Sequence, residues 1–174
     1  MKKLMAAVLA FILPAQNISA QDEGYATLIR TTVLARLADL NPSITFWRDV
    51  MGFSYGGDPD PRTGFSSPLG WTEDATNYFA TFTSKNGAML ALLMVEGDPD
   101  FPSVNMPKTG TAYGGIVLVH MGKEISDVYD RAIKHGVEII KPYGPSRTGK
   151  SMQMLMRAPT GHVVEVYEMV ESEE

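Results

Sequence analysis

The chain has 174 residues, of which 44% are hydrophobic and 20% are charged, and its formal net charge is −5. This size and composition are typical of one globular domain that buries its own core. The acidic balance argues against nucleic acid and anionic membrane surfaces as partners. The sequence contains no cysteine, which excludes disulfides and a lipid-modified cysteine anchor.

The first twenty residues have the layout of a secretory signal peptide. Lys2 and Lys3 precede an apolar run over residues 4–13, and a small-residue site ends at Ala20. This order of positive charge, apolar stretch and small residues directs export. The apolar run is too short for a membrane span, which takes about 20 residues. We therefore expect a signal peptide over 1–20, a mature domain over 21–174, no membrane attachment and a periplasmic or secreted location.

The mature chain opens with the pattern of a strand, a helix and three more strands. Residues 28–37 are rich in β-branched and aliphatic side chains, and Asn41-Pro42 then marks a helix start. Apolar residues recur at helical spacing up to Met51, and Gly52 stands where a left-handed C-cap is usual. The strands that follow are expected at residues 53–55, 77–83 and 88–95.

The second half of the chain repeats this order. A strand is expected at residues 115–120, an amphipathic helix at 124–135 that ends at Gly136, and strands at 137–140, 150–157 and 162–167. The segment 96–113, with its prolines and glycines, is typical of a linker. The sequence therefore predicts a single domain of two βαβββ modules, at about residues 26–95 and 114–170.

Equivalent positions recur in the two modules. The glycines that end the two helices are one such pair, and Gly87 and Gly161 in the last hairpin turn are another. Four residues beyond those turns lie Ala91 and Glu165, which should occupy equivalent points on equivalent strands. Neither module can cover both faces of its sheet alone. We therefore expect an α+β fold in which two curved mixed sheets form a shared cleft, and the cleft is the predicted site for a small-molecule ligand.

Residues 144–151 match the phosphate-loop pattern G-x-x-x-x-G-K-[ST]. Such a loop needs a helix directly after it, because the first amides of that helix face the phosphates. Here the following residues alternate in polarity like a strand and end at Pro159. We interpret the match as a chance resemblance and expect no nucleotide at this segment.

Two segments carry a resemblance to a known family. Residues 38–53, ADLNPSITFWRDVMGF, are similar to that family's segment D-L-x-x-S-x-x-F-Y-x-x-x-L-G-F, and residues 158–165, APTGHVVE, are similar to its D-P-x-G-x-x-x-E. The chain thereby resembles the vicinal-oxygen-chelate superfamily, which includes glyoxalase I, extradiol dioxygenases, fosfomycin-resistance enzymes and bleomycin-resistance proteins. The resemblance extends over nearly all of the mature chain and implies a glyoxalase-like fold.

Metal-dependent members of this family hold a divalent ion through the first and last strands of each module. The resemblance places these positions at Thr32, Ala91, Gly115 and Glu165. Only Glu165 is a strong ligand, and one carboxylate with one hydroxyl does not retain an ion against water. We therefore expect no metal and no other cofactor, with a retained divalent ion as the less favoured alternative.

The remaining candidate residues follow from Glu165 and from the resemblance. Glu165 would be a general base in a mostly apolar cleft, or a relic of the ancestral site that hydrogen-bonds to Thr32 or Tyr167. Arg36 matches an arginine that holds a glutathione carboxylate in glyoxalase I. It would bind a substrate carboxylate or pair with a nearby acid. The resemblance and strand alternation complete the expected substrate-binding set: Arg36, Thr32, Gln153, Leu155, Tyr167, Ala91 and Gly115.

These features favour an exported, metal-independent enzyme of lyase or isomerase type, in which Glu165 moves a proton on a small carboxylate-bearing or aromatic substrate. The alternative is a protein resembling the bleomycin-resistance type, which sequesters a small molecule without chemistry. Families of this fold pair their modules within one chain or between two chains, so the sequence leaves a homodimer open.

Overall fold

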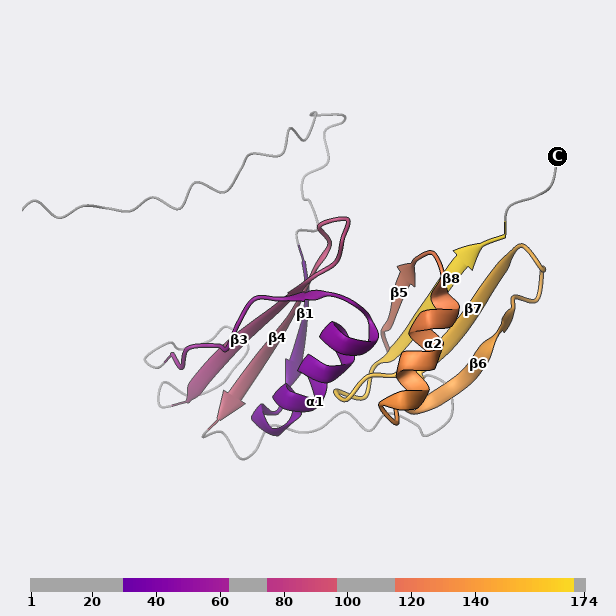
Figure 1. Ribbon diagram of the computed structural model, residues 1–174. Helices are drawn as coiled ribbons and strands as arrows, with labels where there is room; N and C mark the ends of the chain where they lie inside the picture. Colours follow the sequence, from indigo (N-terminus) through magenta and orange to yellow (C-terminus); the bar gives the residue numbers. More distant parts are fainter. Residues whose placement is uncertain (1–29, 63–74, 97–114, 171–174) are drawn as a thin grey trace, which may run out of the picture.

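The computed structural model describes residues 30–62, 75–96 and 115–170 (Figure 1). The predicted signal peptide lies outside these ranges, as does the predicted linker apart from Glu96. Within the described ranges, no helix is both long enough and apolar enough to cross a membrane.

The first module contains four strands and one helical segment. The strands are β1 (Thr31–Ala35), β2 (Ser54–Tyr55), β3 (Thr76–Thr83) and β4 (Met89–Glu96). Between β1 and β2 the chain forms the 3-10 helix η1 (Leu37–Asp39), the α-helix α1 (Leu40–Ile44) and the π-helix η2 (Thr45–Val50). The predicted order of strand, helix and three strands is confirmed.

Burial of one side explains the helical segment of the first module. Its buried residues recur at three- and four-residue spacing, as expected for a helix that packs on a sheet: they are Ser43, Ile44, Phe46, Trp47 and Val50. The last turn is wide, because Met51 N donates to Phe46 O at 2.9 Å, five residues back. Gly52 then has φ +75°, the left-handed conformation that glycine adopts without steric penalty. The predicted helix end is confirmed.

The second module repeats the order with one regular helix. It comprises β5 (Val117–Met121), α2 (Ile125–Lys134), β6 (Ile139–Pro145), β7 (Ser151–Arg157) and β8 (Val163–Met169). At the start of α2, Ile125 N donates to the Glu168 carboxylate at 3.1 Å, which satisfies an amide that the helix itself leaves unpaired. Gly136 follows the helix with φ +67°, so the two modules end their helices in the same way.

The phosphate-loop pattern at residues 144–151 lies in the β6–β7 hairpin. Ser146 N donates to Ser151 O at 2.8 Å, and Gly149 N donates to Ser146 O at 3.0 Å. These bonds close a tight turn that leads into strand β7 rather than into a helix. The prediction that a strand, and not a helix, follows this segment is confirmed.

The strands form two separate four-stranded mixed sheets. Their orders are β1-β4-β3-β2 and β5-β8-β7-β6. In each sheet the first and last strands of a module pair in parallel and the remaining pairs are antiparallel. This arrangement confirms the predicted α+β fold of two βαβββ modules.

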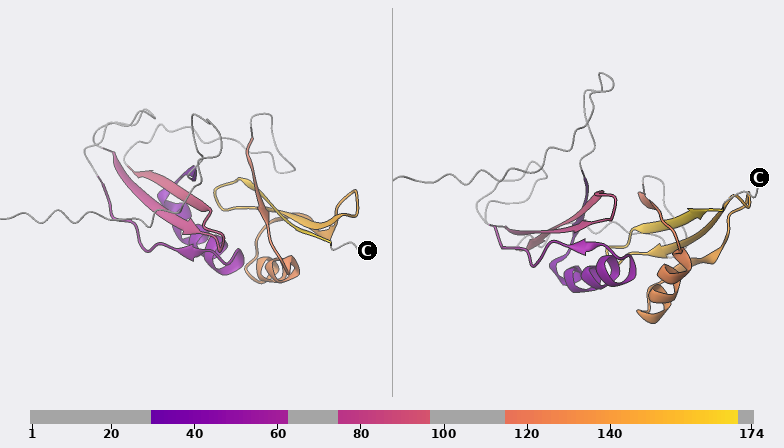
Figure 2. Two further views of the ribbon diagram at one scale, coloured as in Figure 1. Left: turned by 90° about the horizontal axis from the view of Figure 1, so that it is seen from above. Right: turned by 45° about the horizontal axis from the view of Figure 1, so that its top comes forward.

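Both helical segments lie on the same side of the two sheets (Figure 2). The buried side chains on this side form one hydrophobic cluster that contains residues of both modules, including Val33, Phe82 and Leu92 of the first and Met154 and Val166 of the second. Because the cluster is continuous, the modules share one core. We call the opposite side of each sheet, which no described helix covers, its open face.

The two modules contact each other on the helix side. Arg131 Nε of α2 donates to Val50 O at the end of η2 at 2.9 Å. The ring of His120, on β5, lies with its centroid 5.6 Å from that of Trp47 and 5.5 Å from that of Phe53. The modules are thus joined through helices and aromatic rings, and the open faces stay available for other contacts.

Candidate functional site on the open faces

Strand alternation defines the open face of the first module. Val33 is 5% exposed against the helices, whereas the next residue, Leu34, is 47% exposed on the other side. The same alternation and the strand register assign the face its members: Thr32 and Leu34 of β1, Phe79 and Thr81 of β3, and Ala91 and Leu93 of β4. This face is largely apolar.

The structure brings two predicted positions of the first module together. Thr32 and Ala91 are register partners on the parallel strands β1 and β4. Thr32 is exposed, and its Oγ1 accepts a hydrogen bond from Arg30 Nε at 3.2 Å. Ala91 is fully buried and offers no polar side-chain atom. The first module therefore presents one hydroxyl at the place that the resemblance assigns to a metal.

The structure also brings four predicted positions of the second module together. Glu165 of β8 lies in register with Leu155 of β7 on one side and with Val119 of β5 on the other. Gln153 and Tyr167 form the next register pair on the same face. Glu165 and its three predicted neighbours are half-buried. A carboxylate, an amide and a phenol therefore lie beside the apolar side chains of Leu155 and Val119.

Gly115 does not share this arrangement. It lies two residues before β5 and is exposed. The β5 residue beside Glu165 is Val119, as Thr32 is the β1 residue beside Ala91. The register of β5 depends on its pairing with β8, which is distant in the sequence.

Glu165 makes no hydrogen bond or ion pair with any residue that the structure describes. The predicted alternative, a bond from Glu165 to Thr32 or Tyr167, is therefore not formed. The Glu165 carboxylate is only partly buried and is not among the buried side-chain atoms that lack a partner, so it stays accessible to a ligand. The position of Glu165 fits a group that acts on a ligand.

Arg36 lies one residue beyond β1, where the chain turns into η1. Its backbone amide donates to the Asp39 carboxylate at 3.1 Å, which fixes the start of the helical segment. Strand alternation predicted that Arg36 lies on the same face as Thr32. Because β1 ends at Ala35, Arg36 instead lies at the end of the open face.

The residues at the four metal-matched positions do not fit a divalent ion. Thr32 and Glu165 are the only two with a side-chain oxygen, and Val119, beside Glu165, is apolar. Among residues 30–62, 75–96 and 115–170, no three His, Asp or Glu side chains gather as a metal site would require. This donor set gives no basis for a step through a metal.

The histidines lie away from the open faces. His120 is on the helix side of β5 between the rings of Trp47 and Phe53, and its burial lowers its pKa. Burial also lowers the pKa of His162, against a hydrogen bond with Thr160 that raises it. Both shifts favour neutral rings packed in the structure.

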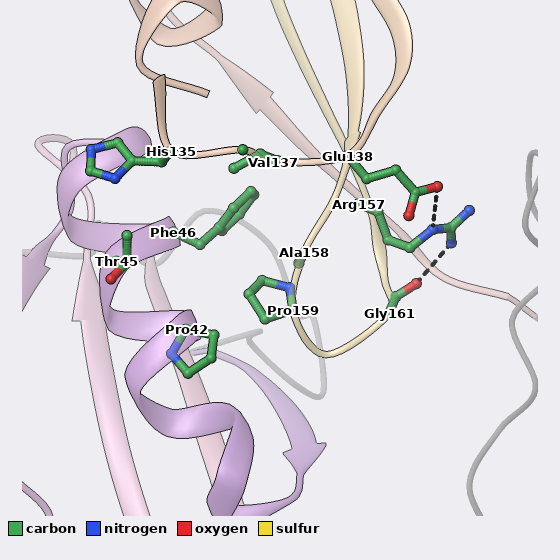
Figure 3. Close-up of a pocket in the computed structure, with 11 residues that line it drawn as sticks. Pro42, Thr45, Phe46, His135, Val137, Glu138, Arg157, Ala158, Pro159 and Gly161 are labelled. Atoms are coloured by element: carbon green, nitrogen blue, oxygen red, sulfur yellow. Dashed lines mark hydrogen bonds and ion pairs between the residues drawn. The ribbon is translucent and has the colours of Figure 1, made fainter. Parts of the chain in front are cut away.

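A pocket of about 450 Å³ lies at the junction of the modules (Figure 3). Phe46 and Pro42 line it from the first module, and the turns around Val137 and Pro159 line it from the second. Arg157, at its edge, donates from Nε to Glu138 at 3.1 Å and from Nη1 to Gly161 O at 3.1 Å. Sequence reasoning missed this pocket, which contains none of the predicted site residues.

Comparison with known proteins supports the architecture. The family model described as Glyoxalase/Bleomycin resistance protein/Dioxygenase superfamily matches residues 30–166. A search of curated proteins found no match.

Three solved structures illustrate the similarity of fold. A glyoxalase family protein from Bacillus cereus has a TM-score of 0.63 at 15% identity, covering 86% of this chain and 100% of that one. A glyoxylase/bleomycin resistance protein/dioxygenase domain from Frankia sp. EAN1pec has a TM-score of 0.57 at 12% identity, covering 86% and 96%. The fosfomycin resistance protein FosX from Listeria monocytogenes has a TM-score of 0.53 at 16% identity, covering 83% and 94%. At these identities the likeness is one of fold.

Proposed function

Because the chain belongs to the Glyoxalase/Bleomycin resistance protein/Dioxygenase superfamily, we propose that it is a metal-independent enzyme of lyase or isomerase type. Its substrate is a small carboxylate-bearing or aromatic molecule bound on the open faces, and Glu165 is the proton acceptor. One observation carries this proposal. Glu165 is half-buried between Val119 and Leu155 and has no partner among the described residues.

The Glu165 carboxylate is accessible on a partly apolar face, and none of its oxygens is among the buried side-chain atoms that lack a partner. Binding pockets typically combine such apolar surface with a few polar groups. A carboxylate that is not occupied by a protein donor can accept a proton from a bound substrate.

The neighbours of Glu165 suit a substrate with one polar and one apolar end. Gln153 and Tyr167 supply an amide and a phenol for orientation, and Leu155 and Val119 supply apolar surface. In the reaction, a substrate C–H bond breaks and its proton moves to Glu165. The electron pair left on carbon either expels a leaving group from the adjacent carbon, as in a lyase, or takes the proton back at another atom, as in an isomerase.

We further propose that a second copy of the chain completes the cleft. Apolar side chains on the open faces remain exposed in a single chain, with Leu34 at 47%, Val119 at 56% and Met121 at 70%. Surfaces of this kind typically mark association sites. The predicted signal peptide supports a periplasmic or secreted location. If the chain forms a dimer, size-exclusion chromatography with light scattering should give twice the mass of the mature chain.

The test of catalysis is Glu165→Gln, which keeps the shape of the side chain and removes its basicity. Thermal-shift screening with small aliphatic acids, aromatic acids and glutathione conjugates identifies a ligand. Proton NMR in D2O then follows exchange of its C–H hydrogens and any turnover. We expect Glu165→Gln to slow exchange and turnover by about 100-fold or more and to change ligand affinity by less than about threefold. An unchanged rate would exclude Glu165 as the base.

Glu124→Gln is the matched control, because Glu124 is exposed at the start of α2 and away from the open face. Its rate should equal that of the wild type.

The competing function is ligand sequestration, which the largely apolar open face of the first module favours. Ligand binding by the wild type without exchange or turnover would establish sequestration in place of catalysis.

A further inference from the structure

The open face of the first module carries an arginine that is not among the predicted site residues. Arg30, directly before β1, donates from Nε to Thr32 Oγ1 at 3.2 Å. Its Cζ lies 4.7 Å from the ring centroid of Phe79 on β3. Because β4 lies between β1 and β3, the Arg30 side chain crosses the open face above β4, where Ala91 is fully buried.

These two contacts hold the guanidinium without neutralising it. The hydroxyl of Thr32 occupies Nε, and the ring of Phe79 supports the planar group through a cation–π contact. A guanidinium has five N–H donors, so both terminal nitrogens keep donors for a ligand. In the described part of the chain Arg30 makes no ion pair, whereas Arg48 pairs with Asp49 and Arg157 pairs with Glu138.

No acidic side chain lies on the part of this open face that the described strands β1, β3 and β4 form. The members of the open face that β1, β3 and β4 contribute are neutral: Thr32, Leu34, Asn77, Phe79, Thr81, Thr83, Met89, Ala91, Leu93 and Val95. A fixed positive charge on such a surface attracts an anion, and the two terminal nitrogens match the two oxygens of a carboxylate. Leu34 and Leu93 offer an apolar surface beside it.

We propose that Arg30 is the carboxylate-binding residue of this protein, held in place by Thr32 and Phe79, and that its ligands are small aromatic carboxylates. The carboxylate binds the terminal guanidinium nitrogens, and the apolar part of the ligand lies on Leu34 and Leu93. The choice of ligand class rests on the proposed function. The binding role of Arg30 does not require that Glu165 be catalytic.

The test compares benzoate with benzamide, which has nearly the same shape and no charge. Isothermal titration calorimetry should show that the wild type binds benzoate more tightly than benzamide. Arg30→Met keeps the apolar stem over Phe79 and removes the charge. It should weaken benzoate binding by about 10- to 100-fold, as expected for loss of charge-assisted hydrogen bonds, and leave benzamide binding within about twofold.

Two further variants separate charge, geometry and folding. Arg30→Lys keeps the charge without the planar fork and should lie between wild type and Arg30→Met. Arg147→Met, an exposed arginine in the β6–β7 turn, should bind like the wild type. Equal benzoate affinity in wild type and Arg30→Met, or equal affinity of the wild type for benzoate and benzamide, would overturn the inference.

The outcomes for Arg30 and Glu165 are separable. Glu165→Gln should keep its preference for benzoate, because Glu165 lies on the other sheet. If Arg30→Met loses that preference while Glu165→Gln turns over normally, the carboxylate site stands and the proposed catalysis falls. If Glu165→Gln is inactive while Arg30→Met keeps the preference for benzoate, the proposed catalysis stands and the carboxylate site at Arg30 is wrong.

Discussion

The first module covers its sheet with a 3-10 helix (Leu37–Asp39), an α-helix (Leu40–Ile44) and a π-helix (Thr45–Val50) in succession. The second module covers its sheet with one regular α-helix, Ile125–Lys134. Both segments bury one side and end at a left-handed glycine. The wide π-helical turn presents the bulky pair Phe46 and Trp47 to the core, both 1% exposed. The second module buries the smaller residues Ile125 and Ala132 instead.

The open faces differ more than the helices. The first carries the guanidinium of Arg30 beside the inert Ala91, and the second carries the carboxylate of Glu165 at the equivalent strand position. A repeated fold therefore keeps its core-facing positions apolar in both copies, while its open-face positions diverge in charge. This difference is consistent with the proposed function, in which the helix side forms the core and the open side binds the substrate.

The largest expected effect is that of Trp47→Ala on both modules. Trp47 is almost fully buried and contacts Phe46, Phe53, Phe82 and His120 through its ring. Truncation of such a residue typically lowers the free energy of unfolding by about 3–5 kcal/mol. Because the core is continuous between modules, amide hydrogen exchange should quicken in β7 and β8 as well as in β3 and β4.

Ile133→Ala is the control, since Ile133 is 54% exposed on α2, and its effect should stay within about 0.5 kcal/mol. Trp47→Leu removes less of the side chain and should stay folded, so that hydrogen exchange can be measured if Trp47→Ala does not fold. Faster exchange confined to the strands of the first module would show that the modules unfold independently, and the single shared core would be wrong.

Local patterns were sufficient to predict most of the fold. Apolar periodicity located both helices, and the glycines at their ends have the φ values expected of left-handed caps. Alternation in β7 distinguished a strand from the helix that residues 144–151 would need as a phosphate loop. On the second open face, the family resemblance predicted Gln153 and Leu155, and alternation predicted Tyr167, beside Glu165.

What could not be predicted depends on register and on contacts across strands. The position of Val119 beside Glu165 follows from how β5 slides along β8, and no turn residue in the sequence fixes that offset. The contact of Arg30 with Phe79 joins strands β1 and β3, which are not neighbours, and depends on the path of one long side chain. The junction pocket requires the relative placement of two modules, which strand and helix patterns do not encode.

A smaller effect is expected from the hydrogen bond that joins the two helical segments. Arg131→Met keeps much of the side-chain volume and removes the donor to Val50 O. The buried Val50 then has an unpaired carbonyl, which costs about 1–3 kcal/mol. The urea midpoint of Arg131→Met should fall accordingly. Lys134→Met, an exposed change on the same helix, should leave the midpoint nearly unchanged, and equal shifts in both variants would contradict a role for this bond.

The smallest expected effect is a change in pH dependence at the junction of the modules. His120 Nε2 is buried without a hydrogen-bond partner among the described residues, and burial lowers the pKa of His120 below its ordinary value of 6.5. Above about pH 6.5 the ring is neutral in both the folded and the unfolded chain. As the pH falls below that value, the unfolded chain takes up a proton that the folded chain resists, so stability decreases towards acid.

His120→Phe keeps an aromatic ring against Trp47 and Phe53 and removes the titrating group. Urea midpoints measured between pH 7.5 and 5 should therefore fall less steeply for His120→Phe than for the wild type. The difference should be well under the ceiling of about 1.4 kcal/mol per pH unit that one proton allows, because the ring is only partly buried. His162 titrates in both proteins and cancels from the comparison. Parallel pH profiles would mean that His120 is not desolvated at the junction, and the modules would then contact each other less tightly than the rings of Trp47 and Phe53 indicate.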